Sequence, residues 1–287
     1  MKYSLMTTSM VFPMADKLHA GTAMDEVKKE YADMLAMVAD CGIPAVEITS
    51  LELDVFGLDF VKSALTRAGL TCGCLIHMDT YAETAEPKHG AIEETAMQKI
   101  LDAKALGADY VMLALMAQPD AEDHGTEELR DALIRNIRPI AAFGAENGVT
   151  VSVEDTPDIR LPLCDSADIR PILDAIPALS LTYDTGNMLL KGEDTLAFYR
   201  ALKDRVVYVH LKDMEYAGQS DNADPTIDRR WIRTALHGQG VLDFGSILRE
   251  LRAGGYDGWL MLEYAGSENH AANIRAAKEM MDKLING

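Results

Sequence analysis

The sequence lacks the features that mark several special classes of protein. Its 287 residues include only 4 cysteines, which are too few for a disulfide framework. No stretch of about 18 consecutive apolar residues is present, so we expect no membrane-spanning segment. Ser, Thr and Pro interrupt the apolar residues at the start of the chain, which argues against a signal peptide. The default expectation is a cytoplasmic protein.

Basic residues are also scarce relative to acidic ones. The chain has 27 Lys and Arg against 46 Asp and Glu, which gives a formal net charge of −19. Nucleic-acid binding draws most of its affinity from phosphate neutralisation, so we expect neither a nucleic-acid partner nor an anionic membrane partner. Arg229, Arg230 and Arg233 form a local basic exception. They could meet an anionic group of a substrate, or equally form a solvated basic face or a subunit contact.

Glycine-rich phosphate loops are missing as well. The sequence contains no Gly-x-Gly-x-x-Gly and no Walker pattern, which argues against an open, doubly wound nucleotide-binding sheet. What recurs instead is a series of short, nearly continuous apolar runs, as expected for strands buried on both faces. These runs are Tyr3–Ser9, Ala45–Thr49, Thr71–His77, Tyr110–Leu115, Thr150–Glu154, Ser180–Asp184, Val206–His210 and Trp259–Tyr264.

Helical patterns separate these runs. Apolar residues at three- and four-residue spacing recur between Val27 and Val38, Ile92 and Ala103, Leu129 and Ile140, and Phe244 and Leu251. Each stripe is followed by a glycine in the usual stop position. Strands alternating with helices predict an α/β fold, and a count of eight strands favours a closed barrel. We therefore predict a single (β/α)8 TIM barrel that forms one domain over residues 1–287.

Polar residues end four of the predicted strands in the second half of the chain. Glu154, Asp184, His210 and Glu263 each stand at or near the end of an apolar run. A single carboxylate in such a place is most often a helix cap, but four such residues on consecutive strands meet at one face of a barrel. Burying three carboxylates together without a cation is costly. The set predicts one divalent metal ion, with Mn²⁺, Mg²⁺ or Co²⁺ the best fit and Zn²⁺ also compatible.

The segments around these residues resemble the xylose isomerase-like barrel proteins, also known as the sugar phosphate isomerase/epimerase or tagatose-3-epimerase-like group. The resemblance covers nearly the whole chain and is most specific from residue 150 to 264. The matching segments are Val151-Ser-Val-Glu-Asp-Thr156, Thr182-Tyr-Asp-Thr-Gly-Asn187, Val207-Tyr-Val-His-Leu-Lys-Asp213, His237-Gly-Gln-Gly-Val-Leu-Asp-Phe244 and Gly258-Trp-Leu-Met-Leu-Glu263.

The resemblance implies roles for several residues. Glu154, Asp184, His210 and Glu263 would bind the metal, and the two glutamates would also act as acid and base on opposite faces of a sugar. Four further residues would contact the substrate, although many family members carry a histidine where this chain has asparagine. These substrate-binding candidates are Glu47, His77, Asn187 and Lys212.

The implied activity is isomerisation or epimerisation of a sugar, polyol or keto-sugar. Proton transfer beside a carbonyl needs a stabilised enediolate, which a chelated metal provides as a Lewis acid, and a carboxylate with a tuned pKa. The expected partner is a small-molecule sugar or polyol, and a homo-oligomer is compatible with such a barrel.

Three alternatives stay open at this point. A keto-inositol-type dehydratase would use the same metal and base but expel a hydroxyl group. A non-catalytic sugar-binding barrel would keep the fold without turnover. An apurinic endonuclease of this barrel type needs three zinc ions, whereas only His77 and His210 fall at predicted strand ends.

The stretch Met214–Leu242 shows little periodicity, which predicts a long functional or mobile loop.

Overall fold

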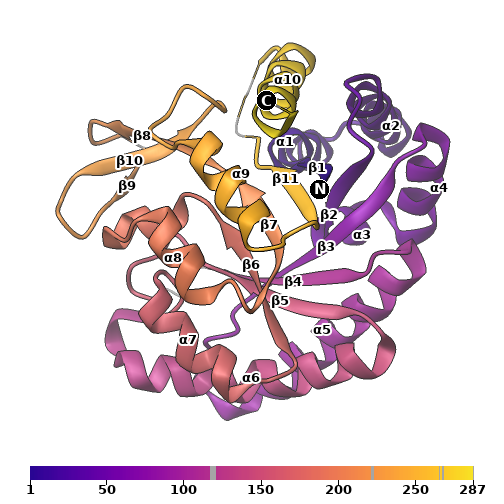
Figure 1. The fold of residues 1–287 in the computed structure, drawn as a ribbon. Coiled ribbons are helices and arrows are strands. Elements are labelled where there is room, and N and C mark those ends of the chain that lie inside the picture. Colours follow the sequence, from indigo (N-terminus) through magenta and orange to yellow (C-terminus); the bar gives the residue numbers. More distant parts are fainter. Residues whose placement is uncertain (117–120, 221–222, 265, 267, 287) are drawn as a thin grey trace.

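The computed structural model describes residues 1–116, 121–220, 223–264, 266 and 268–286. Eight parallel strands close into a barrel in the order β1-β11-β7-β6-β5-β4-β3-β2, surrounded by helices (Figure 1). This closed ring confirms the predicted (β/α)8 barrel. The barrel strands are β1 Lys2–Met6, β2 Ala45–Thr49, β3 Thr71–Asp79, β4 Tyr110–Leu115, β5 Thr150–Glu154, β6 Leu179–Asp184, β7 Val206–Leu211 and β11 Trp259–Leu262.

The helices follow the strands and cover the outside of the barrel (Figure 1). Their apolar stripes pack on the outer strand surface; in α2, for example, Val27, Tyr31 and Leu35 are fully buried. The helices are α1 Thr8–His19, α2 Met24–Asp40, α3 Ser50–Phe56, α4 Leu58–Ala68, α5 Glu86–Leu106, α6 Thr126–Asn147, α7 Ser166–Ala175, α8 Thr195–Leu202, α9 Phe244–Ala253 and α10 His270–Asn286, with short 3₁₀ turns at Ala121–Asp123 and Asn187–Lys191. In the described chain no helix is both long and apolar enough to cross a membrane.

The barrel interior is filled by side chains rather than open. Cys74, Ile76, Met112, Tyr208 and Met261 form a buried cluster of their own, apart from the core between strands and helices. All four cysteines are buried and unbridged. The prediction that the run Thr71–His77 is a buried strand is therefore confirmed at Cys72 and Cys74.

Gly73 makes room for a large side chain in that interior. A Cβ atom at this position would lie 2.8 Å from the hydroxyl of Tyr208, which itself hydrogen-bonds Ser4 Oγ at 2.7 Å. Gly73 is also the extra residue of a bulge, because Val46 pairs with Cys72 whereas Glu47 pairs with Cys74. The bulge changes the pairing of β2 at Glu47, the middle residue of that strand.

Two sequence predictions of local structure are wrong. The first strand ends at Met6, and α1 already begins at Thr8, so the apolar run Tyr3–Ser9 spans a strand end and a helix start. The stretch Met214–Leu242 contains an antiparallel sheet of β8 Asp213–Ala217, β9 Asp224–Pro225 and β10 Trp231–Ala235, at the side of the barrel in Figure 1. Its strands are short and partly exposed, so they give only a weak alternation of apolar residues.

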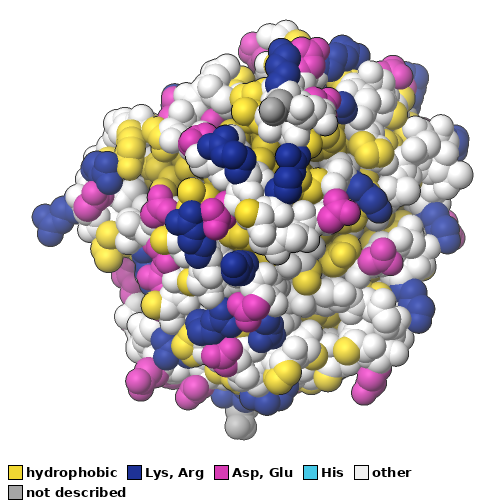
Figure 2. Space-filling view, in the orientation of Figure 1, with side chains coloured by type: hydrophobic (Ala, Val, Ile, Leu, Met, Phe, Trp, Pro, Cys, Tyr) yellow, Lys and Arg dark blue, Asp and Glu magenta, His cyan; other side chains and the backbone are white. Residues whose placement is uncertain are grey.

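Two of the three arginines of this stretch, Arg230 and Arg233, contact neighbouring side chains. Arg230 pairs with Asp228 at 2.7 Å and lies over the ring of Tyr216, and Arg233 pairs with Glu215 at 2.7 Å. On the face drawn in Figure 2, basic and acidic side chains lie interspersed. This face of the described residues therefore offers no continuous basic surface of the kind that a nucleic-acid binder uses.

A buried carboxylate holds the turn from β2 into α3. Glu52 is fully buried, and its Oε2 accepts hydrogen bonds from the backbone N–H of Thr49 at 2.5 Å and from the Thr49 hydroxyl at 3.0 Å. Its Oε1 accepts from Tyr31 at 3.1 Å and from Thr7 at 3.3 Å. This capping box fixes the end of β2, the strand that carries Glu47.

Burial raises the pKa of Glu52 from 4.5 to about 7, because the hydrogen bonds only partly offset the loss of solvation. Between these values the folded protein holds a proton that the unfolded chain has released. Glu52 therefore lowers the free energy of unfolding by about 3 kcal/mol as the pH rises from 4.5 to about 7. Urea unfolding of the parent and of Glu52→Gln at about pH 5 and about pH 8 measures it. The variant should lack this loss of stability. An equal change of the unfolding free energy with pH in both proteins would contradict the raised pKa of Glu52.

Candidate metal centre

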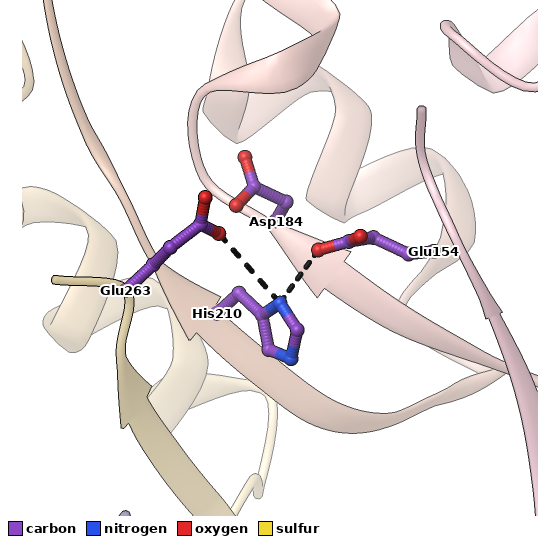
Figure 3. Close-up of side chains that lie close together, drawn as sticks. All are labelled: Glu154, Asp184, His210 and Glu263. Carbon is purple, nitrogen blue, oxygen red and sulfur yellow. Dashed lines mark ion pairs between the residues drawn. The ribbon is translucent and has the colours of Figure 1, made fainter. Parts of the chain in front are cut away.

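Four polar side chains meet at the carboxyl ends of neighbouring barrel strands. Glu154 ends β5, Asp184 ends β6, His210 lies near the end of β7, and Glu263 directly follows β11. The register places Asp184 directly opposite His210. One ligand atom from each of the four residues lies within 4.8 Å of the others, and Figure 3 shows the side chains turned toward a common centre.

The cluster has a closed floor and a partly open rim. The side chain of His210 is fully buried and Asp184 is fully buried, whereas the side chains of Glu154 and Glu263 are each 14% exposed. His210 Nδ1 lies 2.5 Å from Glu154 Oε1 and 3.8 Å from Glu263 Oε2 (Figure 3). A small molecule would thus approach the two glutamates first.

Several ligand atoms of the cluster lack hydrogen bonds. In the described structure Glu154 Oε1, Asp184 Oδ2 and His210 Nδ1 are buried without a hydrogen-bond partner. Glu154 and His210 are close enough for an ion pair, but their atoms do not align as a hydrogen bond does. Buried polar atoms without partners are rare and costly, so their convergence calls for a ligand. Three carboxylates and one imidazole are a donor set that fits a divalent cation.

The electrostatics of the cluster favour a cation as well. Burial raises the pKa of Asp184 well above its usual value, and the nearby charges of Glu263 and Glu154 raise it further against the opposing effect of Lys212. Burial alone would lower the pKa of His210, but the carboxylates of Glu47 and Glu154 raise it well above the usual value. The local field is therefore strongly negative.

Lys212 distinguishes the two glutamates of the cluster. Its Nζ lies 2.6 Å from Glu263 Oε1 and donates to Asn187 Oδ1 at 3.1 Å. Burial opposes the charge of Lys212, but Glu263 and Asp184 raise its pKa, so the ammonium stays charged. Burial likewise opposes ionisation of Glu263, but Lys212 and His210 hold its pKa below the usual value. Glu263 thus has an ammonium partner, whereas the charged neighbour of Glu154 is His210.

Glu47 and His77, the other two predicted substrate contacts, have described contacts to His210 and to α3. Glu47 is 1% exposed and lies behind the imidazole, with Oε1 3.2 Å from His210 Nε2. His77 is directed toward α3, with Nδ1 3.1 Å from Ser50 Oγ and its ring edge-on to Tyr81. Neither of these two contacts of His77 reaches a residue of the four-residue cluster.

Asp155 belongs to the surroundings of the cluster although the sequence analysis assigned it no role. It is fully buried, its Oδ1 accepts from the backbone N–H of Asp184 at 2.8 Å, and its carbonyl accepts from Asn187 Nδ2 at 2.7 Å. Its position directly after Glu154 is the feature of the sequence that points to a place near the cluster. Because neighbouring residues of a strand point to opposite faces, that position alone does not predict a contact with the site.

A cavity of about 570 Å³ is lined in part by the segment that follows β5, and none of the four cluster residues is part of its lining. Thr156, two residues beyond Glu154, and Leu190, from the turn that starts at Asn187, are part of its lining. Arg160 also lines it and is held by Asp158 through two hydrogen bonds of 2.9 and 2.7 Å. The cavity combines apolar walls with a few polar groups, as small-molecule sites commonly do.

Comparison with known proteins places the chain in a family. The profile of the xylose isomerase-like TIM barrel family matches residues 35–284, which are most of the chain. The chain belongs to this family. Within the xylose isomerase-like barrels, an inosose dehydratase of Lacticaseibacillus casei is 30% identical over 116 residues, 38% of this chain and 39% of that protein. The aligned part thus spans less than half the length of this curated relative.

Solved structures of other xylose isomerase-like barrels are similar over almost their full length. D-allulose 3-epimerase from Methylomonas sp. has a TM-score of 0.74 and 17% identity, covering 99% of this chain and 98% of that one. The IOLI protein, solved with a zinc atom bound, has a TM-score of 0.74 and 15% identity, covering 100% and 98%. At these identities the comparisons establish a shared fold.

Proposed function

We propose that this xylose isomerase-like barrel is a divalent-metal-dependent isomerase or epimerase that moves a proton beside the carbonyl of a sugar, polyol or keto-sugar. The observation that carries the proposal is the convergence of three carboxylate oxygens and one imidazole nitrogen within 4.8 Å. The similarity to an inosose dehydratase and to a D-allulose 3-epimerase supports the same class of substrate.

Glu154, Asp184, His210 and Glu263 are the proposed metal ligands. The oxygen-rich donor set favours Mn²⁺, Mg²⁺ or Co²⁺, and Zn²⁺, which the IOLI protein binds, is also compatible. A divalent ion held there would supply Lewis-acid polarisation of the substrate carbonyl.

Glu154 and Glu263 are the proposed acid and base. Both side chains are partly exposed at the rim, so both can reach a substrate. Glu154 would accept the proton from the substrate carbon on one face. Glu263 would serve the opposite face. Lys212 and Asn187 are joined by a hydrogen bond beside Glu263 and are the proposed contacts for substrate hydroxyl groups.

Dehydration is the second candidate function, and the pairing of Lys212 with Glu263 favours it together with the inosose dehydratase relative. In this case Glu154 removes the proton beside the carbonyl, and the hydroxyl group on the next carbon leaves as water after taking up a proton. Lys212 beside Glu263 on one side and His210 beside Glu154 on the other make the two sides of the site chemically unequal.

Deuterium incorporation tests the proposal. Chelator-stripped protein, with and without added Mn²⁺, is incubated in D₂O with a panel of ketoses and keto-polyols. We expect Mn²⁺-dependent label beside the carbonyl, and the products distinguish epimerisation, isomerisation and dehydration. Protein that binds metal but exchanges no label would overturn the proposed reaction. Protein that binds no metal would overturn the ligand assignment.

Replacing Lys212 should change the pH dependence of this exchange. In Lys212→Met the effect of burial on Glu263 is no longer offset by the ammonium, so the pKa of Glu263 rises. A metal ligand must be ionised, so the acidic limb of the pH–rate profile should move to higher pH. Lys191→Met is a matched control, because Lys191 pairs with Asp168 outside the cluster. An unmoved limb in Lys212→Met would refute this role of the lysine.

A further inference from the structure

Glu47 is the buried carboxylate on the opposite side of His210 from the candidate metal centre. The side chains of Glu47 and His210 are both fully buried, and Glu47 Oε1 lies 3.2 Å from His210 Nε2. We propose that Glu47 is a positioning residue that fixes the imidazole of His210 for metal binding. This inference rests on the metal site of the proposed function and gives Glu47 a role different from substrate contact.

The two nitrogens of the ring face different groups. Nδ1 faces Glu154 and Glu263, at 2.5 and 3.8 Å, whereas Nε2 faces Glu47. When Nε2–H donates to Glu47, Nδ1 presents its lone pair to the cluster. Carboxylates that accept from the second nitrogen of a metal-binding histidine fix its tautomer and increase its strength as a ligand. Tyr208 packs edge-on against the same ring at 5.8 Å and adds a steric restraint to the electrostatic one.

The strand geometry around Glu47 supports this role. The bulge at Gly73 shifts the pairing of β2 with β3 at Glu47, and bulges beside functional sites commonly re-aim one side chain. The carbonyl of Glu47 accepts from the Thr7 hydroxyl at 3.2 Å, which restrains the backbone at this point. The backbone of Glu47 is thus held from both neighbouring strands, since Glu47 also pairs with Met6 of β1.

A structural role alone accounts poorly for this carboxylate. Glu47 Oε2 is buried without a hydrogen-bond partner in the described structure, so the side chain is not fully satisfied. Leaving a buried carboxylate half satisfied costs free energy, whereas an apolar side chain of similar size would not. The partner that its other oxygen does have is the histidine of the metal centre.

The dissociation constant for Mn²⁺ tests the proposal directly. Glu47→Leu removes the acceptor, and we expect it to weaken Mn²⁺ binding by about 10- to 100-fold. Glu47→Gln keeps an acceptor oxygen without its charge and should lie between Glu47→Leu and the parent. Glu83→Gln is the matched control, because Glu83 is also a buried carboxylate but contacts Ala85 and Lys88 away from β2 and the cluster. It should leave Mn²⁺ affinity unchanged.

NMR of histidine side chains provides a readout that a purely structural role would not move. In Zn²⁺-loaded protein labelled with ¹⁵N-histidine, the Nε2–H proton of His210 should resonate far downfield and exchange slowly. It should move upfield in Glu47→Gln and exchange rapidly in Glu47→Leu. The spectrum of His210→Gln assigns the signal. If Glu47→Leu does not fold, the Mn²⁺ dissociation constant and the Nε2–H signal are both measured on Glu47→Gln.

The outcomes separate this inference from the proposed function. Suppose first that Asp184→Asn loses Mn²⁺ binding. Parent-like Mn²⁺ affinity and an unmoved Nε2–H signal in the folded Glu47 variants would then overturn the role of Glu47 but not the metal site. Parent-like Mn²⁺ affinity in Asp184→Asn as well would overturn the metal site. Weakened Mn²⁺ binding in both Glu47 variants supports the inference even if no substrate of the panel exchanges label.

Discussion

Glu154→Gln should reduce Mn²⁺-dependent deuterium exchange by about 10²- to 10⁴-fold, the usual contribution of a positioned acid or base. Glutamine keeps the size of the side chain and one oxygen that can still act as a ligand, but it cannot accept a proton from carbon. The effect should be large because the side chain of Glu154 is partly exposed at the rim of the cluster, where a substrate can reach it.

Exchange by this variant is measured at saturating Mn²⁺, so that weaker metal binding is separated from lost chemistry. We expect the loss in kcat rather than in KM, since the interaction is made as the proton moves. Glu279→Gln, at an exposed position on α10, is the control and should match the parent. Exchange at parental rates by metal-loaded Glu154→Gln would exclude Glu154 as the base.

Asp184→Asn should have two opposite effects, on metal binding and on stability. Asp184 is fully buried, and burial and neighbouring carboxylates raise its pKa. Its Oδ1 accepts from the backbone N–H groups of Gly186 and Asn187, and an asparagine oxygen can accept both. Without metal, the variant should therefore be more stable than the parent by about 2 kcal/mol, because a buried charge is removed from a negative cluster.

With metal the order should reverse. At a Mn²⁺ concentration of about 100 times Kd the parent gains about 2.7 kcal/mol, and the variant, having lost a ligand, gains nothing. Thermal unfolding with and without Mn²⁺ measures both effects, and Asp109→Asn at an exposed position is the control. A metal-free variant that is less stable than the parent would mean that Asp184 is needed for folding rather than tolerated for metal binding.

Most of the barrel could be predicted from the sequence because its strands are buried on both faces. Three predicted runs, Ala45–Thr49, Tyr110–Leu115 and Thr150–Glu154, coincide with β2, β4 and β5. Such strands produce continuous apolar runs with clear ends, and their polar last residues necessarily meet at one rim. The convergence of Glu154, Asp184, His210 and Glu263 follows from that topology.

The side-chain directions could not be predicted in the same way. Glu47 lies in the middle of β2 and His77 near the end of β3. The bulge in β3 and the packing against α3 place Glu47 behind His210 and His77 beside Ser50. A bulge of one residue leaves almost no trace in an apolar run. The partners of Arg230 and Arg233 were equally hidden, because the antiparallel pairing that brings Glu215 opposite Arg233 depends on tertiary structure.

Barrel closure also determines when the cluster can be completed during synthesis. The ring closes where Lys2 of β1 pairs with Trp259 of β11, and Glu263 follows that last strand. On the ribosome, β1 therefore waits for a partner that emerges some 250 residues later, with its unpaired edge exposed meanwhile. Three of the four proposed metal ligands emerge before Glu263, so a nascent chain would offer a metal ion only an incomplete set. Loading of the proposed site would thus follow closure of the ring, and chaperone protection of the open edge would matter most in that interval.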